Sequence, residues 1–99
     1  MKTVQDYFDL AKQINNIDSD YALAKAMGVK QQEVSFIRNK ERKINDTMAT
    51  KLALLIGIDP MEIIIVANYW DGSKRNKEFW EWYHRQREDK KFNLSQFGK

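Results

Sequence analysis

The sequence predicts an all-α protein of 99 residues. Apolar residues recur at spacings of three and four along most of the chain, which is the period of an amphipathic helix. Capping residues stand before these periodic segments, and glycine or asparagine stands after them. Residues 63–66 would also suit a β-strand, but Asp59 and Pro60 directly before them form a helix start signal. We therefore expect helices throughout.

Three helices are expected before residue 40. The first begins at a capping box of Thr3 and Asp6 and ends at residues 15–16, which are both asparagine. The second follows Ser19, a good N-cap, and ends at Gly28, because glycine adopts the left-handed conformation without steric cost. The third covers residues 30–39, and the polar, basic residues 40–45 follow it as a loop. The side chains expected to face inward are Val4, Tyr7, Phe8, Ala11, Ile14, Leu23, Ala24, Met27, Val34 and Ile37.

Three more helices are expected after the loop. Asn45 caps a fourth helix that ends at Gly57, and a fifth runs from Pro60 to about Tyr69. Residues 63–67 are apolar in every direction around the fifth helix, so it is either enclosed by the domain or covered by a second subunit. A break at residues 71–73 precedes a sixth, aromatic helix over residues 77–88, and residues 90–99 have no helical period. The inward side chains of the fourth helix are expected to be Met48, Leu52, Leu55 and Ile56.

The composition indicates a small cytoplasmic protein. The chain is 42% hydrophobic, which is sufficient for one small core, and its longest apolar run is far too short to span a membrane. The first residues contain acidic side chains and no signal-peptide core. We expect two parts, a domain over residues 1–70 and a closing or dimerisation element over residues 71–99.

Positive charge is concentrated in two blocks, although the net charge is only +3. Residues 30–43 contain five basic and two acidic side chains, and residues 72–99 contain eight basic and four acidic ones. The block between them is acidic and apolar. A basic block favours a polyanionic partner and salt-dependent association.

Residues 19–39 have the requirements of a helix-turn-helix motif. Ala24 is small where the next helix must cross closely, and Gly28 stands where the backbone must turn. Apolar side chains at Leu23, Met27, Val29, Val34 and Ile37 would fix the crossing angle. On these residues the stretch LAKAMGVKQQEVSFIRNKERKIND, residues 23–46, resembles the lambda-repressor-like helix-turn-helix family, which includes phage repressors and Cro proteins. The resemblance extends over about residues 3–69, as five helices in the family's order.

The resemblance implies a mode of DNA binding. In the family the third helix lies in the major groove, and its first residues contact base edges. Residue by residue, this makes Gln31, Gln32 and Ser35 candidates for base contacts, with Phe36 a candidate for a thymine methyl group. Candidates for phosphate contacts are Lys30, Arg38, Asn39, Lys40, Arg42 and Lys43.

Two positions depart from the family's pattern. Asp20 stands where the family commonly has a glutamine that binds phosphate, and a carboxylate there would repel phosphate; Ser19 or the helix N-terminus is the alternative contact. Phe36 replaces a residue that is usually polar, so it either contacts DNA or packs against the protein.

The function that the resemblance implies is a sequence-specific transcriptional regulator, a repressor of phage or mobile-element type. It would bind a roughly palindromic operator in double-stranded DNA as a homodimer. The resemblance also implies a bacterial cytoplasm, with the protein associated with the nucleoid. The alternative is a protein-interaction module such as an antitoxin, which would bind a partner protein through the aromatic C-terminal region. The aromatic residues suit either a lid on the core or a dimer contact. The residues expected at the dimer interface are Ile63, Val66, Trp70, Phe79, Trp80, Trp82 and Tyr83.

Nothing in the sequence favours an enzyme. The chain has no cysteine and one histidine, His84. It therefore lacks most of the side chains from which a catalytic nucleophile–base pair or a metal site is usually built. His84 lies among charged residues and suits an ordinary surface position. We expect no cofactor, no metal ion and no small-molecule ligand.

Overall fold

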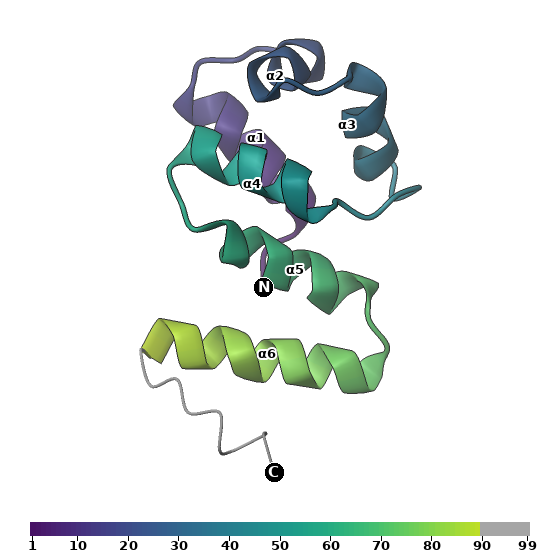
Figure 1. Cartoon of the computed structure of the whole chain (residues 1–99), viewed down its shortest axis with the longest axis vertical. Coiled ribbons are helices and arrows are strands. Elements are labelled where there is room, and N and C mark those ends of the chain that lie inside the picture. The colour runs from purple at the N-terminus through teal and green to yellow at the C-terminus, as the bar shows by residue number, and fades with distance from the viewer. Residues whose placement is uncertain (90–99) are drawn as a thin grey trace.

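Six helices make up residues 1–89, the part of the chain that the computed structural model describes (Figure 1). This confirms the all-α prediction for that range, including residues 63–66, which are helical. The expectation for residues 90–99 lies outside the described residues. The helices are α1 (Val4–Ile14), α2 (Asp20–Met27), α3 (Gln31–Arg38), α4 (Asp46–Ile56), α5 (Pro60–Asp71) and α6 (Lys74–Asp89).

The helix starts follow the capping signals of the sequence. Thr3 and Asp6 form the reciprocal capping box, with the backbone N–H of each donating to the side chain of the other at 2.8 and 3.2 Å. The side chain of Ser19 caps α2, and those of Asn45 and Asp59 cap α4 and α5. These bonds satisfy N–H groups that have no partner within the helix.

The core lies where α1, α2, α4 and α5 meet. Phe8, Leu23, Leu52 and Ile63 are completely buried there, one from each helix. Ile14 was expected inside, but half of its surface is exposed, because α1 ends at this residue and the backbone turns at Asn16 with a φ of +54°. The other expected inward side chains are buried, except Val29, Leu55 and Ile56, which are partly buried and pack against the core.

Helix α5 is enclosed within the chain. Ile63 and Val66 belong to the core and are 0% and 1% exposed, which corrects the expectation that they contact a second subunit. Ile65 is also fully buried but lies outside that core cluster. Helix α6 runs back along α5 in the opposite direction (Figure 1) and packs against it. Helix α5 is therefore apolar on more than one side because one side packs into the core and another packs against α6.

Helix α6 begins three residues earlier than predicted, because Ser73 acts as its cap. The Ser73 side chain accepts from the N–H of Asn76, and its carbonyl accepts from the N–H of Lys77 at 2.9 Å. Four aromatic residues of α6 form a connected cluster, namely Phe79, Trp80, Trp82 and Tyr83. The rings of Phe79 and Tyr83 are stacked with centroids 6.4 Å apart. No residue of α6 is fully buried, so the aromatic rings keep part of their surface exposed.

Candidate nucleic-acid interface

The turn between α2 and α3 has the geometry that the motif requires. Gly28 is in the left-handed region with a φ of +72°, and the N–H of Val29 donates to the Ala24 carbonyl at 3.0 Å. Ala24 is 2% exposed and therefore permits the close crossing. Val34 and Ile37 bury the inner face of α3, so its other face projects away from the domain.

Three of the four base-contact candidates lie on the exposed face of α3. Gln31, Gln32 and Ser35 are exposed, and within residues 1–89 no hydrogen bond engages their side chains. Both glutamine amides are therefore available to a ligand. Phe36 is half-buried, and the guanidinium of Arg42 lies over its ring at 4.8 Å from the centroid. The Phe36 ring therefore packs against Arg42 and keeps part of its surface exposed.

The basic loop after α3 turns back toward the helix. The N–H groups of Glu41 and Arg42 both donate to the carbonyl of Phe36, and Lys40 has a positive φ of +61°. Lys40 and Arg42 are exposed, as are Lys30 and Asn39. Lys43 is also exposed, but its ammonium group donates to the Asn68 side chain at 2.7 Å. The loop thus brings several cations to the C-terminal end of α3, whereas the exposed glutamines lie at its N-terminal end.

Arg38 differs from the other phosphate candidates. Its guanidinium donates to both carboxylate oxygens of Asp20 at 2.9 and 3.0 Å and to Asp9 at 2.7 Å. Only a fifth of the side chain is exposed. Arg38 therefore joins α3 to α1 and α2, and its donors face protein carboxylates.

Asp20 is neutralised by this arrangement. Lys12 approaches the carboxylate at 3.2 Å, in addition to Arg38. Burial by itself would raise the pKa of Asp20, but the hydrogen bonds from Arg38 and Lys12 outweigh it and hold the pKa below its ordinary value. Burial opposes the shift at Arg38 as well, where the hydrogen bonds to Asp9 and Asp20 outweigh it and raise the pKa. The negative charge expected to repel phosphate is thus balanced by two cations.

Sequence reasoning missed the residues of α1 that hold α3. The Gln5 side chain donates to the Ile37 carbonyl at 3.1 Å, at the C-terminal end of α3. Asp9 and Lys12 belong to the ion-pair network around Arg38. The spacing of Gln5, Asp9 and Lys12 places them on one side of α1, which was the available signal. Their partners lie up to 33 residues away in the sequence and could not be predicted from it.

The comparison with protein families decides the identity of the motif. Residues 16–63 match a family model described as Helix-turn-helix, and they span α2, α3 and α4 together with the start of α5. Residues 16–63 form a lambda-repressor-like helix-turn-helix domain. The match supports a DNA-binding transcription regulator, since this helix-turn-helix family is a DNA-binding regulatory one. Neither a curated protein nor a solved structure matches the chain significantly.

The helix-turn-helix domain and its C-terminal helix carry no candidate membrane span. Within residues 1–89 no helix combines the length and the hydropathy needed to cross a bilayer.

Proposed function

We propose that this protein is a sequence-specific regulator that inserts α3 into the major groove of double-stranded DNA and represses transcription at its operator. The observation that carries the proposal is the pair of exposed glutamines, Gln31 and Gln32, at the projecting N-terminal end of α3. A glutamine amide donates to and accepts from adenine at once, and each such pair discriminates by about 1–3 kcal/mol. Ser35 lies on the same exposed face, one turn further along α3.

The proposed phosphate contacts are the exposed polar residues at the two ends of α3. They are Lys30, Asn39, Lys40, Arg42 and Lys43. These contacts would orient the domain on the duplex without carrying sequence information. We leave Arg38 out of this set because its donors are occupied by Asp9 and Asp20. Phe36 would support Arg42 by stacking beneath its guanidinium.

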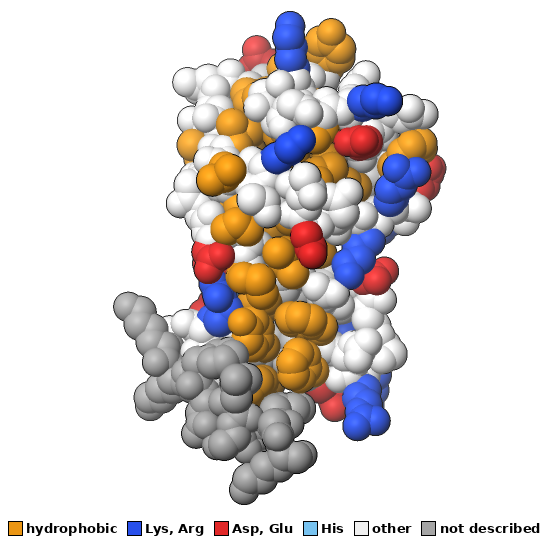
Figure 2. Space-filling view, in the orientation of Figure 1, with side chains coloured by type: hydrophobic (Ala, Val, Ile, Leu, Met, Phe, Trp, Pro, Cys, Tyr) orange, Lys and Arg blue, Asp and Glu red, His pale blue; other side chains and the backbone are white. Residues whose placement is uncertain are grey.

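We further propose that the protein acts as a homodimer on a roughly palindromic operator, with half-sites about 34 Å apart. The support is the partly exposed aromatic surface of the α5–α6 hairpin, where hydrophobic side chains gather (Figure 2). Trp70 is 49% exposed there. The residues proposed for this contact are Trp70, Phe79, Trp80, Trp82 and Tyr83. Trp70 is the last residue of the proposed domain over residues 1–70, and the other four belong to the proposed dimerisation element over residues 71–99.

Sedimentation tests the oligomeric state directly. We expect a dimer on operator DNA, and replacement of the exposed Trp70 by alanine should shift the distribution toward monomer. A protein that sediments as a monomer at micromolar concentration, and that also binds DNA as a monomer, would contradict the dimer proposal.

The base-contact proposal is tested after the preferred site has been selected from a random DNA pool. Gln31→Ala and Gln32→Ala should each lower the preference for that site over scrambled DNA by about 5- to 150-fold, which corresponds to the discrimination of one bidentate contact. Weak binding to any DNA should persist, because the phosphate contacts remain. The matched control is Gln13→Ala, which changes an exposed glutamine of α1. Discrimination equal to that of the unaltered protein in a competition gel-shift would remove both glutamines from the interface.

A further inference from the structure

A cavity of about 400 Å³ lies beside the basic loop, between the C-terminal ends of α3 and α5. The loop and the end of α5 lie on the same side of the molecule (Figure 1), and Lys43 joins them through its hydrogen bond to the Asn68 side chain. Side chains from the start of α1, from α3, from the loop and from α5 line the cavity. Its volume suits a small organic molecule.

The floor of this cavity is apolar. Four side chains of the hydrophobic core line it, each with 4–8% of its surface exposed, namely Val4, Ile37, Ile44 and Ala67. Trp70 lies at the edge and is 49% exposed, and its indole N–H donates to the Lys2 carbonyl at 2.9 Å. An apolar ring placed there would remove its own surface and the floor from water, which is favourable.

The rim of the cavity carries an excess of positive charge. Lys40, Arg42 and Lys43 line it, together with one carboxylate, Asp71, which is the partner of Lys43 at 3.9 Å. Among residues 1–89, Lys40 and Arg42 form no side-chain ion pair or hydrogen bond, and the contact of the Arg42 guanidinium is with an aromatic ring. Glu41 is exposed but does not line the cavity. The N–H donors of Lys40 and Arg42 are therefore available to an anion.

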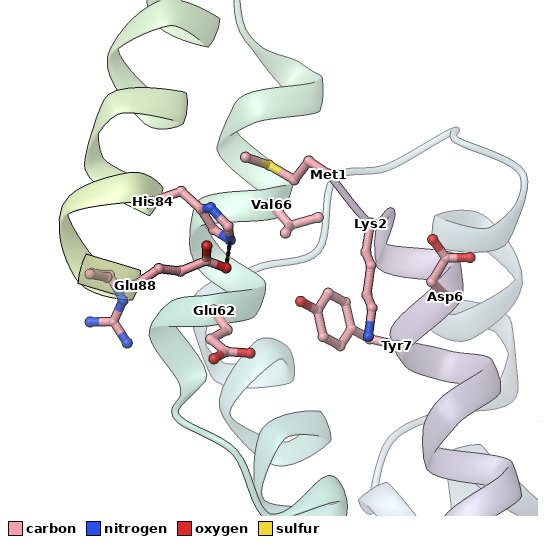
Figure 3. Close-up of a pocket in the computed structure, with 9 residues that line it drawn as sticks. Met1, Lys2, Asp6, Tyr7, Glu62, Val66, His84 and Glu88 are labelled. Carbon is pink, nitrogen blue, oxygen red and sulfur yellow. Dashed lines mark ion pairs between the residues drawn. The ribbon is translucent and has the colours of Figure 1, made fainter. Parts of the chain in front are cut away.

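A second cavity lacks this combination. It measures about 680 Å³ and lies between the first residues of the chain, α1, α5 and α6 (Figure 3). Three acidic and three basic groups line it, so its charges balance: Asp6, Glu62 and Glu88 against the amino group of Met1, Lys2 and Arg87. The cavity beside the basic loop has three cations against one carboxylate, and it also has an apolar floor.

We propose that the cavity beside the basic loop binds a small aromatic carboxylate, with its ring on the apolar floor and its carboxylate between Lys40 and Arg42. The chemistry of the two halves of the site matches the two halves of such a ligand. A phosphate group of DNA would engage the cations and leave the floor uncovered.

The consequence for regulation rests on the proposed function, because Lys40 and Arg42 are also proposed phosphate contacts. A carboxylate held between them would compete with the DNA backbone for the same N–H donors. The ligand would therefore lower the affinity for DNA, and DNA would lower the affinity for the ligand by the same factor. The regulator would in this way respond to an organic acid.

The first experiment measures binding of phenylacetate to the full chain without DNA, by isothermal titration calorimetry and by ¹H–¹⁵N NMR at constant ionic strength. We expect saturable binding, with chemical-shift changes at the backbone amides of Ile37, Arg42 and Ala67. Two matched ligands separate the charge from the ring, since phenylacetamide lacks the charge and acetate lacks the ring. Each should bind at least about tenfold more weakly.

Three outcomes of this experiment would overturn the proposal. Phenylacetate that does not saturate would show that there is no site. Acetate that binds as tightly as phenylacetate would show a diffuse counter-ion layer, and phenylacetamide that binds as tightly would show that the cations take no part.

Two cation variants test the position of the carboxylate. Arg42→Gln removes a cation of the rim and should weaken phenylacetate binding at least about tenfold, together with DNA binding. The matched control Lys30→Gln removes an exposed cation at the opposite end of α3, outside the cavity, and should weaken DNA binding alone. If both variants keep the phenylacetate affinity of the unaltered protein, or both lose it equally, the site is refuted.

Ala67→Leu tests the position of the ring. The larger side chain would occupy part of the floor and should weaken phenylacetate binding at least about fivefold, with the charges unchanged. Its melting temperature shows whether the core still forms, and Arg42→Gln, which changes an exposed residue, decides the matter if it does not. Trp70 is left unchanged because it also belongs to the proposed dimer contact. A folded Ala67→Leu protein with unaltered affinity would overturn the placement of the ring.

The competition is measured with the selected DNA site. At a saturating concentration of phenylacetate the dissociation constant for DNA should rise at least about fivefold, and acetate at equal ionic strength should leave it unchanged. A protein that binds phenylacetate and keeps its DNA affinity would overturn the competition. The measurement without ligand tests the proposed function separately, because a protein that binds phenylacetate and no DNA would refute that function while confirming the ligand site.

Discussion

Arg38 gives the sharpest test of how α3 is held, because the sequence and the structure assign it different roles. As a cation at the end of the motif it was expected to contact phosphate. In the structure its guanidinium is bound by Asp20 and Asp9. The informative substitution is Arg38→Met, which keeps an unbranched apolar side chain and removes the guanidinium, including its position over the Phe8 ring at 5.4 Å from the centroid.

The expected cost follows from the exposure of the three side chains. The Asp9 carboxylate is 61% exposed, so its pair with Arg38 contributes little, about 0–1 kcal/mol. The bidentate pair with Asp20 is better shielded, since the two side chains are 20% and 33% exposed. We assign that pair about 1 kcal/mol, because Lys12 remains beside Asp20 in the variant. The total is a decrease of about 1–2 kcal/mol in the free energy of unfolding, or a melting temperature lower by about 5–15 °C.

Two assays together separate the alternatives. Urea unfolding measures the change in stability. DNA affinity measured between 50 and 200 mM salt gives a slope that decreases in magnitude by about 0.9 for each phosphate that the protein no longer neutralises. Arg38→Met should be less stable and keep the slope of the unaltered protein.

The matched variant is Lys40→Met, which removes an exposed cation of the loop. It should keep its stability and reduce the slope. If Arg38→Met instead keeps its urea midpoint and reduces the slope, Arg38 contacts phosphate and our reasoning about the network is refuted.

Three further predictions concern the fold. Gly28→Ala should cost about 1–2 kcal/mol in urea unfolding, because an alanine at a φ of +72° is strained although its Cβ would meet no neighbour; an unchanged midpoint would contradict this. Gly72→Ala should cost about 1–3 kcal/mol and change tryptophan fluorescence, since its Cβ would lie 2.7 Å from the Asn76 Cβ; equal stability would mean that the α5–α6 connection adjusts freely. The lowered pKa of Asp20 means that the folded protein releases this proton more readily than the unfolded chain, so its stabilising effect is present above about pH 4 and disappears as the pH falls through the folded-state pKa. Asp20→Asn should therefore flatten the acid limb of a stability–pH curve, and an identical limb would count against the network.

The local signals of the sequence predicted most of the helix boundaries. Caps such as Ser19 and Asn45, and glycines such as Gly28, act on backbone groups within a few residues, so their effect can be read from the sequence alone. The start of α6 was less clear, because Ser73 follows an aspartate and a glycine in a stretch that is equally typical of a break between helices.

The long-range contacts could not be predicted in this way. The side chains of α5 are apolar in every direction, which left two alternatives, enclosure by the same chain or cover by a second subunit. Only the position of α6 in the structure showed that the chain itself packs against this helix. At the candidate interface, the exposure of Gln31 and Gln32 followed from helical periodicity. The structural role of Arg38 depends on its partners Asp9 and Asp20, which lie 29 and 18 residues away. The sequence shows that Arg38 is charged, but it does not show which group the guanidinium binds.

The two ends of α3 are attached to the domain very differently. Gln5, Asp9 and Asp20 fasten its C-terminal end, whereas no side-chain hydrogen bond holds the cap residue Lys30 or, among the described residues, Gln31 and Gln32. Substitutions at the free end are therefore nearly independent of folding stability. In evolutionary terms, such a helix can acquire a new DNA target through one or two substitutions while the fold that presents it stays intact.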